Sequence, residues 1–191
     1  MSLELRPYPG YKRDGVPWAG VVPAHWAVEK LKFLTEKIVG GATPKSTQPE
    51  YWDGDIVWVT PRDVSRSHVL HDSARHLSKE GLASCASVIV PEGSVILTSR
   101  APVGNVAIAA VELATNQGCK AIVPDRRQLV PLYALFMCGV MKEELQSVSN
   151  GTTFDELSTS SLANQMVPVP PPTEQCAIAR FLTNHVTQSA R

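Results

Sequence analysis

The chain has 191 residues, of which 43% are hydrophobic, and this predicts one medium-sized domain with a substantial core. Its 18 basic and 18 acidic residues cancel, which lowers the expectation of nucleic-acid binding without excluding a local basic patch. No apolar run approaches the roughly 20 residues that cross a bilayer, so we expect no membrane segment and a cytoplasmic protein. The four cysteines form no C-x-x-C pair, which favours buried thiols in a reducing compartment.

The N-terminal part of the chain divides into an arm and the start of the domain. Residues 1–21 are rich in Pro, Gly and Tyr without periodicity, so they predict an irregular arm. The apolar residues of Val28–Ile38 recur at helical spacing and predict a helix. A strand plus a short helix remains the alternative, because several residues here are good strand formers. Gly40–Lys45 is expected to be a loop, and it lacks the G-K-[ST] ending of a P-loop.

The middle of the chain contains short apolar runs bounded by Pro, Gly and Asn. Such runs predict buried strands joined by exposed turns. The expected strands are Ile56–Val59, Cys85–Val90, Val95–Thr98, Val106–Val111 and Cys119–Val123. Trp52 and Trp58 are interpreted as core residues rather than as platforms for stacked bases.

The last third of the chain predicts helices interrupted by prolines. One helix is expected over Leu132–Val148, and Thr153-x-x-Glu156 is a candidate capping box for a short helix after it. Met166–Val169 predicts a strand, which Pro170-Pro171-Pro172 ends. A terminal helix is expected to follow, with Thr173 as its N-cap. Its apolar stripe usually requires a partner helix, in this chain or in another. The stripe includes Ile178, Phe181, Leu182 and Val186.

The segment Pro61–Lys79 is the most basic and polar part of the chain. Arg, Lys and partly protonated His side chains suit contact with phosphates, so the segment is a candidate nucleic-acid contact. A metal site is the competing interpretation, because His68, His71 and His76 lie close together in the sequence. Asp72 is a lone carboxylate candidate beside them, and no cysteine or paired carboxylate completes a site, so we expect no metal.

The stretch Val95–Ala121 contains polar turns that carry Arg100, Asn116, Gln117 and Lys120. Side chains of these types make the paired hydrogen bonds that distinguish base edges or hold phosphates. The same side chains also brace turns through hydrogen bonds to the backbone. From the residues alone both interpretations stay open.

The sequence lacks the motifs of several common enzyme classes. It contains no [DE]-x-K pair, no G-x-S-x-G, no S-x-x-K, no H-E-x-x-H and no glycine-rich cofactor loop. Its acidic residues are scattered, and no two of them stand out as an acid–base couple. The sequence therefore predicts a binding module rather than an enzyme.

Six short motifs in a fixed order carry a resemblance to a known family. Each motif is weak alone, but together they are specific, and they extend from Val22 to the C-terminus. They are Val22-Pro-x-x-Trp26, Gly41-x-Thr43-Pro44, Tyr51-Trp52-x-Gly54-x-Ile56-x-Trp58, Ser99-Arg100-Ala101-Pro102-Val103-Gly104, Thr115-Asn116-Gln117-Gly118 and Pro170-Pro171-Pro172-x-Glu174-Gln175-x-x-Ile178-Ala179-x-Phe181-Leu182. With these motifs the chain resembles a target recognition domain from the specificity subunit of a type I restriction-modification system.

The resemblance implies an α/β fold over residues 22–169, with a twisted, mainly antiparallel or mixed sheet plus helices. It implies a non-catalytic subunit that binds double-stranded DNA and reads one half of a split target. Residues 170–191 would begin a spacer helix that pairs with a second recognition domain, in cis or in trans. Modification subunits and a restriction subunit would methylate adenine and cleave DNA. We expect no cofactor on this chain, with S-adenosylmethionine, ATP and Mg on those partners.

The candidate DNA contacts are Lys45, Arg62, Arg66, His68, Arg75, Lys79, Arg100 and Lys120. The motifs around Arg100 and Asn116 are shared across the resembled family, so they cannot encode a preference that differs between its members. We therefore expect Val95–Ala121 to frame the reading loops and Pro61–Lys79 to read the bases. Two other functions stay open, namely a protein-interaction scaffold that acts through the terminal helix and an enzyme that uses the histidine cluster with a metal.

Overall fold

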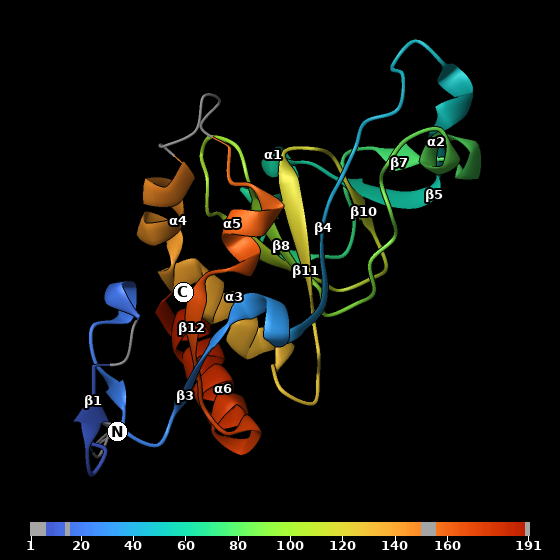
Figure 1. Ribbon diagram of the computed structural model, residues 1–191. Coiled ribbons are helices and arrows are strands. Elements are labelled where there is room, and N and C mark those ends of the chain that lie inside the picture. The colour runs from blue at the N-terminus through green and yellow to red at the C-terminus, as the bar shows by residue number, and fades with distance from the viewer. Residues whose placement is uncertain (1–6, 14–15, 150–155, 190–191) are drawn as a thin grey trace.

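The computed structural model describes residues 7–13, 16–149 and 156–189, whose arrangement is shown in Figure 1. The elements in chain order are β1 (Tyr11–Lys12), η1 (Pro17–Ala19), β2 (Val22–Pro23), β3 (Ala27–Lys30), η2 (Leu31–Phe33), β4 (Thr35–Gly40), η3 (Pro49–Tyr51), β5 (Trp52–Val59), α1 (Pro61–Val64), β6 (Val69–Leu70), β7 (His76–Leu77), α2 (Lys79–Ala83), β8 (Val95–Thr98), β9 (Val106–Ala109), β10 (Ala114–Thr115), β11 (Cys119–Pro124), α3 (Pro131–Val140), α4 (Lys142–Ser149), α5 (Thr159–Ala163), β12 (Met166–Val169) and α6 (Pro172–Ser189), where η denotes a 3-10 helix.

A five-stranded mixed sheet forms the centre of the domain, with strand order β4-β11-β8-β9-β6. β11 pairs antiparallel with β4 and β8, β8 pairs antiparallel with β9, and β6 runs parallel to β9. Every residue of β8 and β11 is buried, because the sheet is covered on both faces. Val95 and Leu97 belong to one core, whereas Ile96 between them belongs to a second core on the opposite face. The predicted mixed α/β fold is confirmed.

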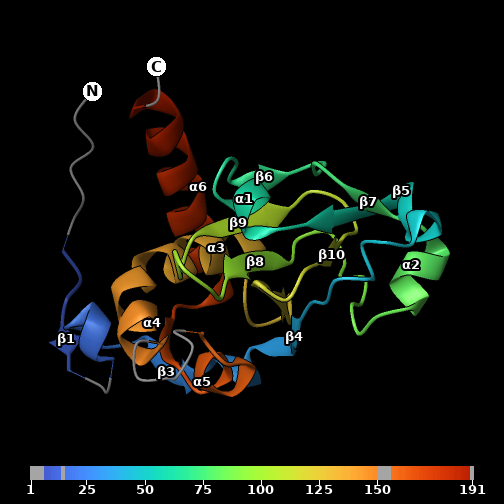
Figure 2. The same cartoon turned by 90° about the horizontal axis from the view of Figure 1, so that it is seen from above.

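The two ends of this sheet carry different structures, as Figures 1 and 2 show. At one end α3, α4 and α6 gather beside the N-terminal strands, and Tyr133, Leu145 and Ala179 join the larger core. At the other end a three-stranded sheet of order β10-β5-β7 lies next to α2. Trp52 and Trp58 are buried in the small core of that end, so their interpretation as core residues is confirmed.

The helix predicted over Val28–Ile38 is wrong, and the alternative with a strand and a short helix is closer. β3 and β4 flank the 3-10 helix η2 here, and they pair with β12 and β11, respectively. Leu31 and Leu34 are both buried, at one turn of 3-10 helix. The helical spacing in the sequence therefore reflects that single turn rather than a long helix.

Two further predicted elements differ from the structure. Cys85–Val90 is not a strand, because its one strand-like contact is an isolated bridge between Val90 and Leu113. Val88 and Ile89, just before that bridge, are exposed. The helix predicted over Leu132–Val148 is divided into α3 and α4 at the buried Met141. The Met141 carbonyl accepts from the Leu145 amide at 2.9 Å, so hydrogen bonding continues across a break that spacing alone does not reveal.

The two termini also correct the sequence predictions. The arm is not wholly irregular, because β1 pairs with β2 across the predicted boundary at residue 22. The terminal helix begins at Pro172, so Thr173 lies inside its first turn, and the Pro171 carbonyl accepts the first helical hydrogen bonds. Thr153 lies outside the described residues, and Ser158 instead caps α5. Among the described helices, none has the length and apolar character that crossing a membrane requires.

The cysteines only partly match the expectation of buried thiols. Cys119 and Cys138 are buried, and burial raises the pKa of each thiol to about 12, which keeps both protonated. Cys85 is half-buried and Cys176 on α6 is exposed.

Two adjacent residues of α6 fix this helix to the rest of the domain. Glu174 accepts hydrogen bonds from the Trp26 indole at 3.1 Å and from the Tyr8 hydroxyl, and its second oxygen lies 2.9 Å from His25 Nε2. Gln175 is completely buried, and its oxygen accepts from the Val130 amide at 2.8 Å. Its side-chain nitrogen donates to two carbonyls, at 2.8 and 2.9 Å. The two side chains therefore set the direction of α6 relative to the arm and to α3.

Replacing Gln175 with Leu should destabilise the domain, because it takes this partner from the Val130 amide, the Gln128 carbonyl and the buried Pro170 carbonyl. The expected loss in the free energy of unfolding is about 2–4 kcal/mol, measured by urea denaturation. Replacing the exposed neighbour Thr173 with Ala is the control and should change stability by less than about 0.5 kcal/mol. Equal stabilities of the two variants would contradict this role for Gln175.

Candidate nucleic-acid interface

The basic segment Pro61–Lys79 is anchored by a buried carboxylate. α1 follows Thr60, whose amide donates to Asp63 Oδ2 at 2.9 Å in a capping box. The other oxygen of Asp63 accepts from the Ala74 amide at 3.3 Å. Asp63 is 9% exposed, so it ties the start of α1 to the chain that leads into β7. One acidic side chain thereby closes this loop upon itself and gives the basic residues fixed positions.

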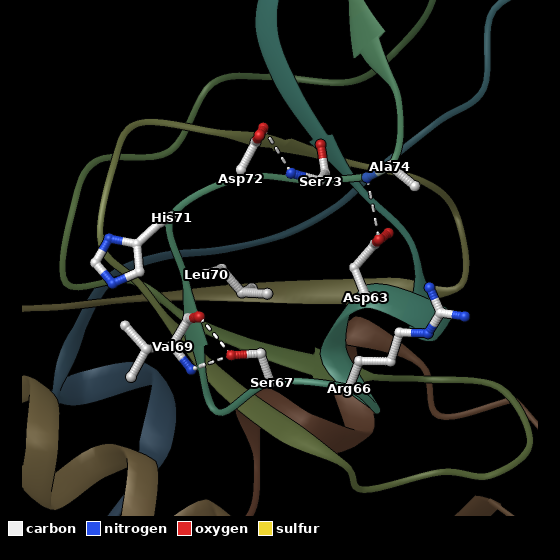
Figure 3. A pocket seen from close by; sticks show the side chains of 9 residues that line it. All are labelled: Asp63, Arg66, Ser67, Val69, Leu70, His71, Asp72, Ser73 and Ala74. Atoms are coloured by element: carbon white, nitrogen blue, oxygen red, sulfur yellow. Dashed lines mark hydrogen bonds between the residues drawn. The ribbon is translucent and has the colours of Figure 1, made fainter.

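A shallow pocket of about 380 Å³ opens within this loop. Figure 3 shows Leu70 and Asp63 near its centre, with His71 and Arg66 on opposite sides. The pocket is polar at its rim, where the Ser73 amide donates to Asp72 at 2.8 Å. Its mixed lining and open form suit contact with a surface that reaches over the loop.

The structure leaves most of the predicted contact residues accessible. Arg100 is exposed, and so are six residues outside the Val95–Ala121 turns, namely Lys45, Arg62, Arg66, His68, Arg75 and Lys79. Among the described residues, none of these six forms an ion pair with a carboxylate. Figure 2 shows α1, β6, β7 and β5 along one edge of the molecule, so most of these cations follow one edge. Cations without acidic partners are available to phosphates.

The three histidines of this segment have separate surroundings. His76 Nε2 lies 2.8 Å from Asp72 Oδ1, His68 Nδ1 lies 3.3 Å from the Val106 carbonyl, and His71 lines the pocket. The hydrogen bond from the Ser73 amide, followed by the attraction of His76, holds the pKa of Asp72 below its usual value. Within the described part of the chain, no three potential ligands gather as a metal site would require.

Arg100 and Lys120 share one carboxylate. Arg100 Nη2 lies 2.9 Å from Glu156 Oε2, and Lys120 Nζ lies 3.3 Å from Oε1. Lys120 is only 8% exposed and is paired with Glu156, which disfavours the predicted DNA contact at this residue. Desolvation alone would raise the pKa of Glu156, but the hydrogen bonds and charges of Arg100 and Lys120 outweigh it and lower that pKa. These residues join β8, β11 and the chain before α5.

The polar turns of Val95–Ala121 are braced in the same way. Asn116 Oδ1 accepts from the Gly118 amide at 2.9 Å, and Gln117 Oε1 accepts from the Thr43 hydroxyl at 2.5 Å. A side chain at Gly118 would collide with Pro61, since a Cβ there would lie 2.8 Å from the Pro61 ring. This glycine therefore permits α1 to approach the turn closely. Bracing is thus the role that the structure supports for Asn116.

Sequence reasoning missed Asn105 as the residue that connects this frame to the chain around α1. Asn105 donates to the Ser65 hydroxyl at 2.9 Å and accepts from Lys142 Nζ at 2.8 Å. The chain around α1 is thereby linked to the β8–β9 turn and to the start of α4. The signal in the sequence was the position of Asn105 directly after a glycine in a polar turn. In the structure that glycine, Gly104, has a φ of +90°, which favours glycine.

Residues 23–190 match the family described as "Type I restriction modification DNA specificity domain", and the chain belongs to this family. It is 41% identical to the type I restriction enzyme MjaIX specificity subunit of Methanocaldococcus jannaschii, over 86% of this chain and 38% of that protein. It is 26% identical to the EcoR124I/EcoR124II specificity subunit of Escherichia coli, over 80% of this chain and 40% of that protein. The chain therefore spans about two fifths of the length of these relatives.

Solved structures support the fold. The structure described as "Crystal structure of HsdS subunit from Thermoanaerobacter tengcongensis" matches with a TM-score of 0.69 and 21% identity, over 96% of this chain and 40% of that one. A second structure, described as concerning complex assembly and conformational transition of the type I R-M system, has a TM-score of 0.70 and 23% identity. It covers 96% of this chain and 42% of that one. Family membership confirms the predicted target recognition domain and its assignment as a specificity component rather than a catalytic one.

Replacing Glu156 with Gln should destabilise the domain at neutral pH by about 1–3 kcal/mol, because it leaves the buried Lys120 without its anionic partner. The pKa of Glu156 is lowered in the folded state, so its stabilisation is full above the unfolded pKa and is lost as pH falls through the folded one. The difference between wild type and variant should therefore shrink below about pH 4.5. Urea denaturation at several pH values measures it.

The exposed Glu143, replaced with Gln, is the matched control for this experiment and should leave stability nearly unchanged at every pH. A destabilisation of the Glu156 variant that stays constant down to pH 3 would rule out the ionic contribution.

Proposed function

We propose that this chain reads one half of a split double-stranded DNA target for a type I restriction-modification complex. The observation that carries the proposal is a set of exposed basic residues, most of them along the α1–α2 edge, none with a carboxylate partner among the described residues. A formally neutral chain with such a local patch can bind a polyanion through one edge. Family membership supports sequence recognition as the purpose of that edge.

Along this edge some residues would contact phosphates and others would contact base edges. Arg62 and Arg66 on and beside the short helix α1 would hold phosphates, as would Lys45 and Lys79. Polar atoms around the pocket, including His71, would approach base edges in the major groove. Arg100 faces Glu156, so it would contribute to the frame and add at most one phosphate contact.

The terminal helix supports a role in assembly. Ile178 and Leu182 line an apolar groove of about 420 Å³ with the arm and α3, so part of the predicted stripe finds its partner within this chain. Phe181 stacks on His185, with ring centres 4.0 Å apart, and the side chain of Val186 lies outside the described part of the structure. Figure 2 shows the rest of α6 projecting from the body. We propose that this projecting part pairs with a second recognition domain, in cis or in trans.

The remaining partners follow from the same proposal. Modification subunits carrying S-adenosylmethionine would methylate adenine beside the target, and a restriction subunit using ATP and Mg would cleave DNA. This chain would hold no cofactor itself. A scaffold that acts through α6 without base readout is the second candidate, favoured by the projection of that helix. Removing only residues 183–191, which leaves Glu174, Gln175 and the core residue Ala179 in place, separates the two. A scaffold then loses its partners, whereas a reader keeps residual DNA affinity.

Binding of the assembled complex to duplex DNA should weaken steeply as salt rises, because phosphate contacts release counterions. Replacing Arg62 and Arg66 together with Gln should reduce the slope of log K against log salt by about two, since each contact contributes roughly 0.9. Fluorescence anisotropy between about 50 and 200 mM salt measures the slope.

The matched control is Arg127, an exposed arginine that pairs with Asp125 in the turn between β11 and α3. Its replacement with Gln should leave the slope unchanged. Absence of duplex binding by the wild-type complex would disprove the proposal, and an unchanged slope in the double variant would remove α1 from the interface.

A further inference from the structure

Arg75 has a contact that the other exposed cations of the interface lack. Its guanidinium carbon lies 3.4 Å from the centre of the Trp52 ring, a separation at which two flat groups lie face to face. Among the described residues, no other arginine lies over an aromatic ring in this way. Arg62 on α1 and Arg66 just after it are also exposed, but neither lies over an aromatic ring.

The Trp52 ring is itself fixed. It is 7% exposed and packs edge-on against Trp58, with ring centres 5.2 Å apart. Its indole N–H donates to the Lys45 carbonyl at 3.3 Å. A buried indole with a satisfied N–H and an aromatic neighbour has little freedom to move. The ring is therefore a rigid support for whatever stacks on it.

The backbone of Arg75 is fixed as well. Its carbonyl accepts from the Trp58 amide at 3.2 Å and from the Ser73 hydroxyl at 2.7 Å. Directly after it, β7 pairs with β5, with His76 opposite Val57. The side chain is thus held at its base by the small sheet and at its tip by the Trp52 ring.

Stacking leaves the hydrogen-bond donors of Arg75 available. The N–H groups of a guanidinium lie in its plane, so a ring against one face does not block them. Arg75 is exposed, and within the described part of the chain no carboxylate forms an ion pair with it. The residue therefore presents a fork of donors with a fixed plane and a fixed position.

We propose that Arg75 reads a guanine in the major groove, an inference that rests on the proposed function. Guanine offers two acceptors, O6 and N7, whose spacing matches the fork of an arginine. A phosphate can also accept two hydrogen bonds from an arginine, but its oxygens point in several directions, so a mobile guanidinium can reach it too. A fixed plane is of most use toward a base edge, whose two acceptors lie in one plane. Pre-organisation reduces the rotamer entropy lost on contact. Arg62 and Arg66, which lack this support, are phosphate contacts.

The test uses the assembled methyltransferase, with the target defined by sequencing methylated adenines in the genome of cells that express it. Replacing Arg75 with Lys keeps the charge and removes the planar fork. This variant should lose discrimination between guanine and other bases at one target position by about tenfold. Arg127, the exposed arginine paired with Asp125 outside this edge, is the control, and its replacement with Lys should keep the base preference at every position. Thermal unfolding of both variants verifies that the fold is retained.

A modified duplex provides a second measurement, in which the DNA is changed and Trp52 is left as it is. Replacing that guanine with 7-deazaguanine removes N7, so it should weaken binding by the wild type more than binding by the Arg75→Lys variant, which has no planar fork to lose. A target without guanine, or a uniform loss of methylation in Arg75→Lys with base preferences intact, would overturn the inference while the proposed function stands. Absence of any split target in the wild type would instead overturn the proposed function.

Discussion

The burial of β8 and β11 on both faces is the constraint on which the rest of this domain depends. Because neither strand has an exposed face, their apolar residues hold the sheet between two cores and fix the turns at its ends. Glu156 joins those turns by binding Arg100 and Lys120 together. Asn105, at the end of the turn between β8 and β9, donates a hydrogen bond to Ser65 and so fixes the chain beside α1. The basic edge is therefore held in place in part by these contacts, which connect it to the turns at the ends of the buried strands.

A second fixed connection lies at the opposite end of the sheet. Glu174 and Gln175 are neighbours in the sequence, yet Glu174 binds Tyr8 of the N-terminal arm and Gln175 binds Val130, the residue before α3. This arrangement fixes the direction in which α6 leaves the domain (Figure 2). If α6 separates two recognition domains, its direction also determines how each basic edge meets the DNA. The domain would thus combine a rigid reading edge with a rigid exit for its spacer.

The sequence predicted the central strands and the helical character of the C-terminal third because their signals are local. Val95–Thr98 is an apolar run between turn residues, and such a run specifies a doubly buried strand without knowledge of its partners. Lys120 shows the limit, because it sits in a polar motif and only the fold reveals that Glu156, 36 positions away, neutralises it. Val28–Ile38 shows a second limit, since strand pairing with β11 and β12 overrides helical spacing. The stack of Arg75 on Trp52 joins segments that no sequence pattern connects.

The central claim is that Pro61–Lys79 reads the bases while Val95–Ala121 only supports it. A structure of the assembled complex on its target duplex tests this most directly. The account predicts that side chains of Pro61–Lys79 lie within about 3.2 Å of base-edge atoms in the major groove. It also predicts that Arg100, Asn116 and Gln117 keep their contacts within the protein. Base contacts made by the turns of Val95–Ala121, with Pro61–Lys79 away from the groove, would contradict it.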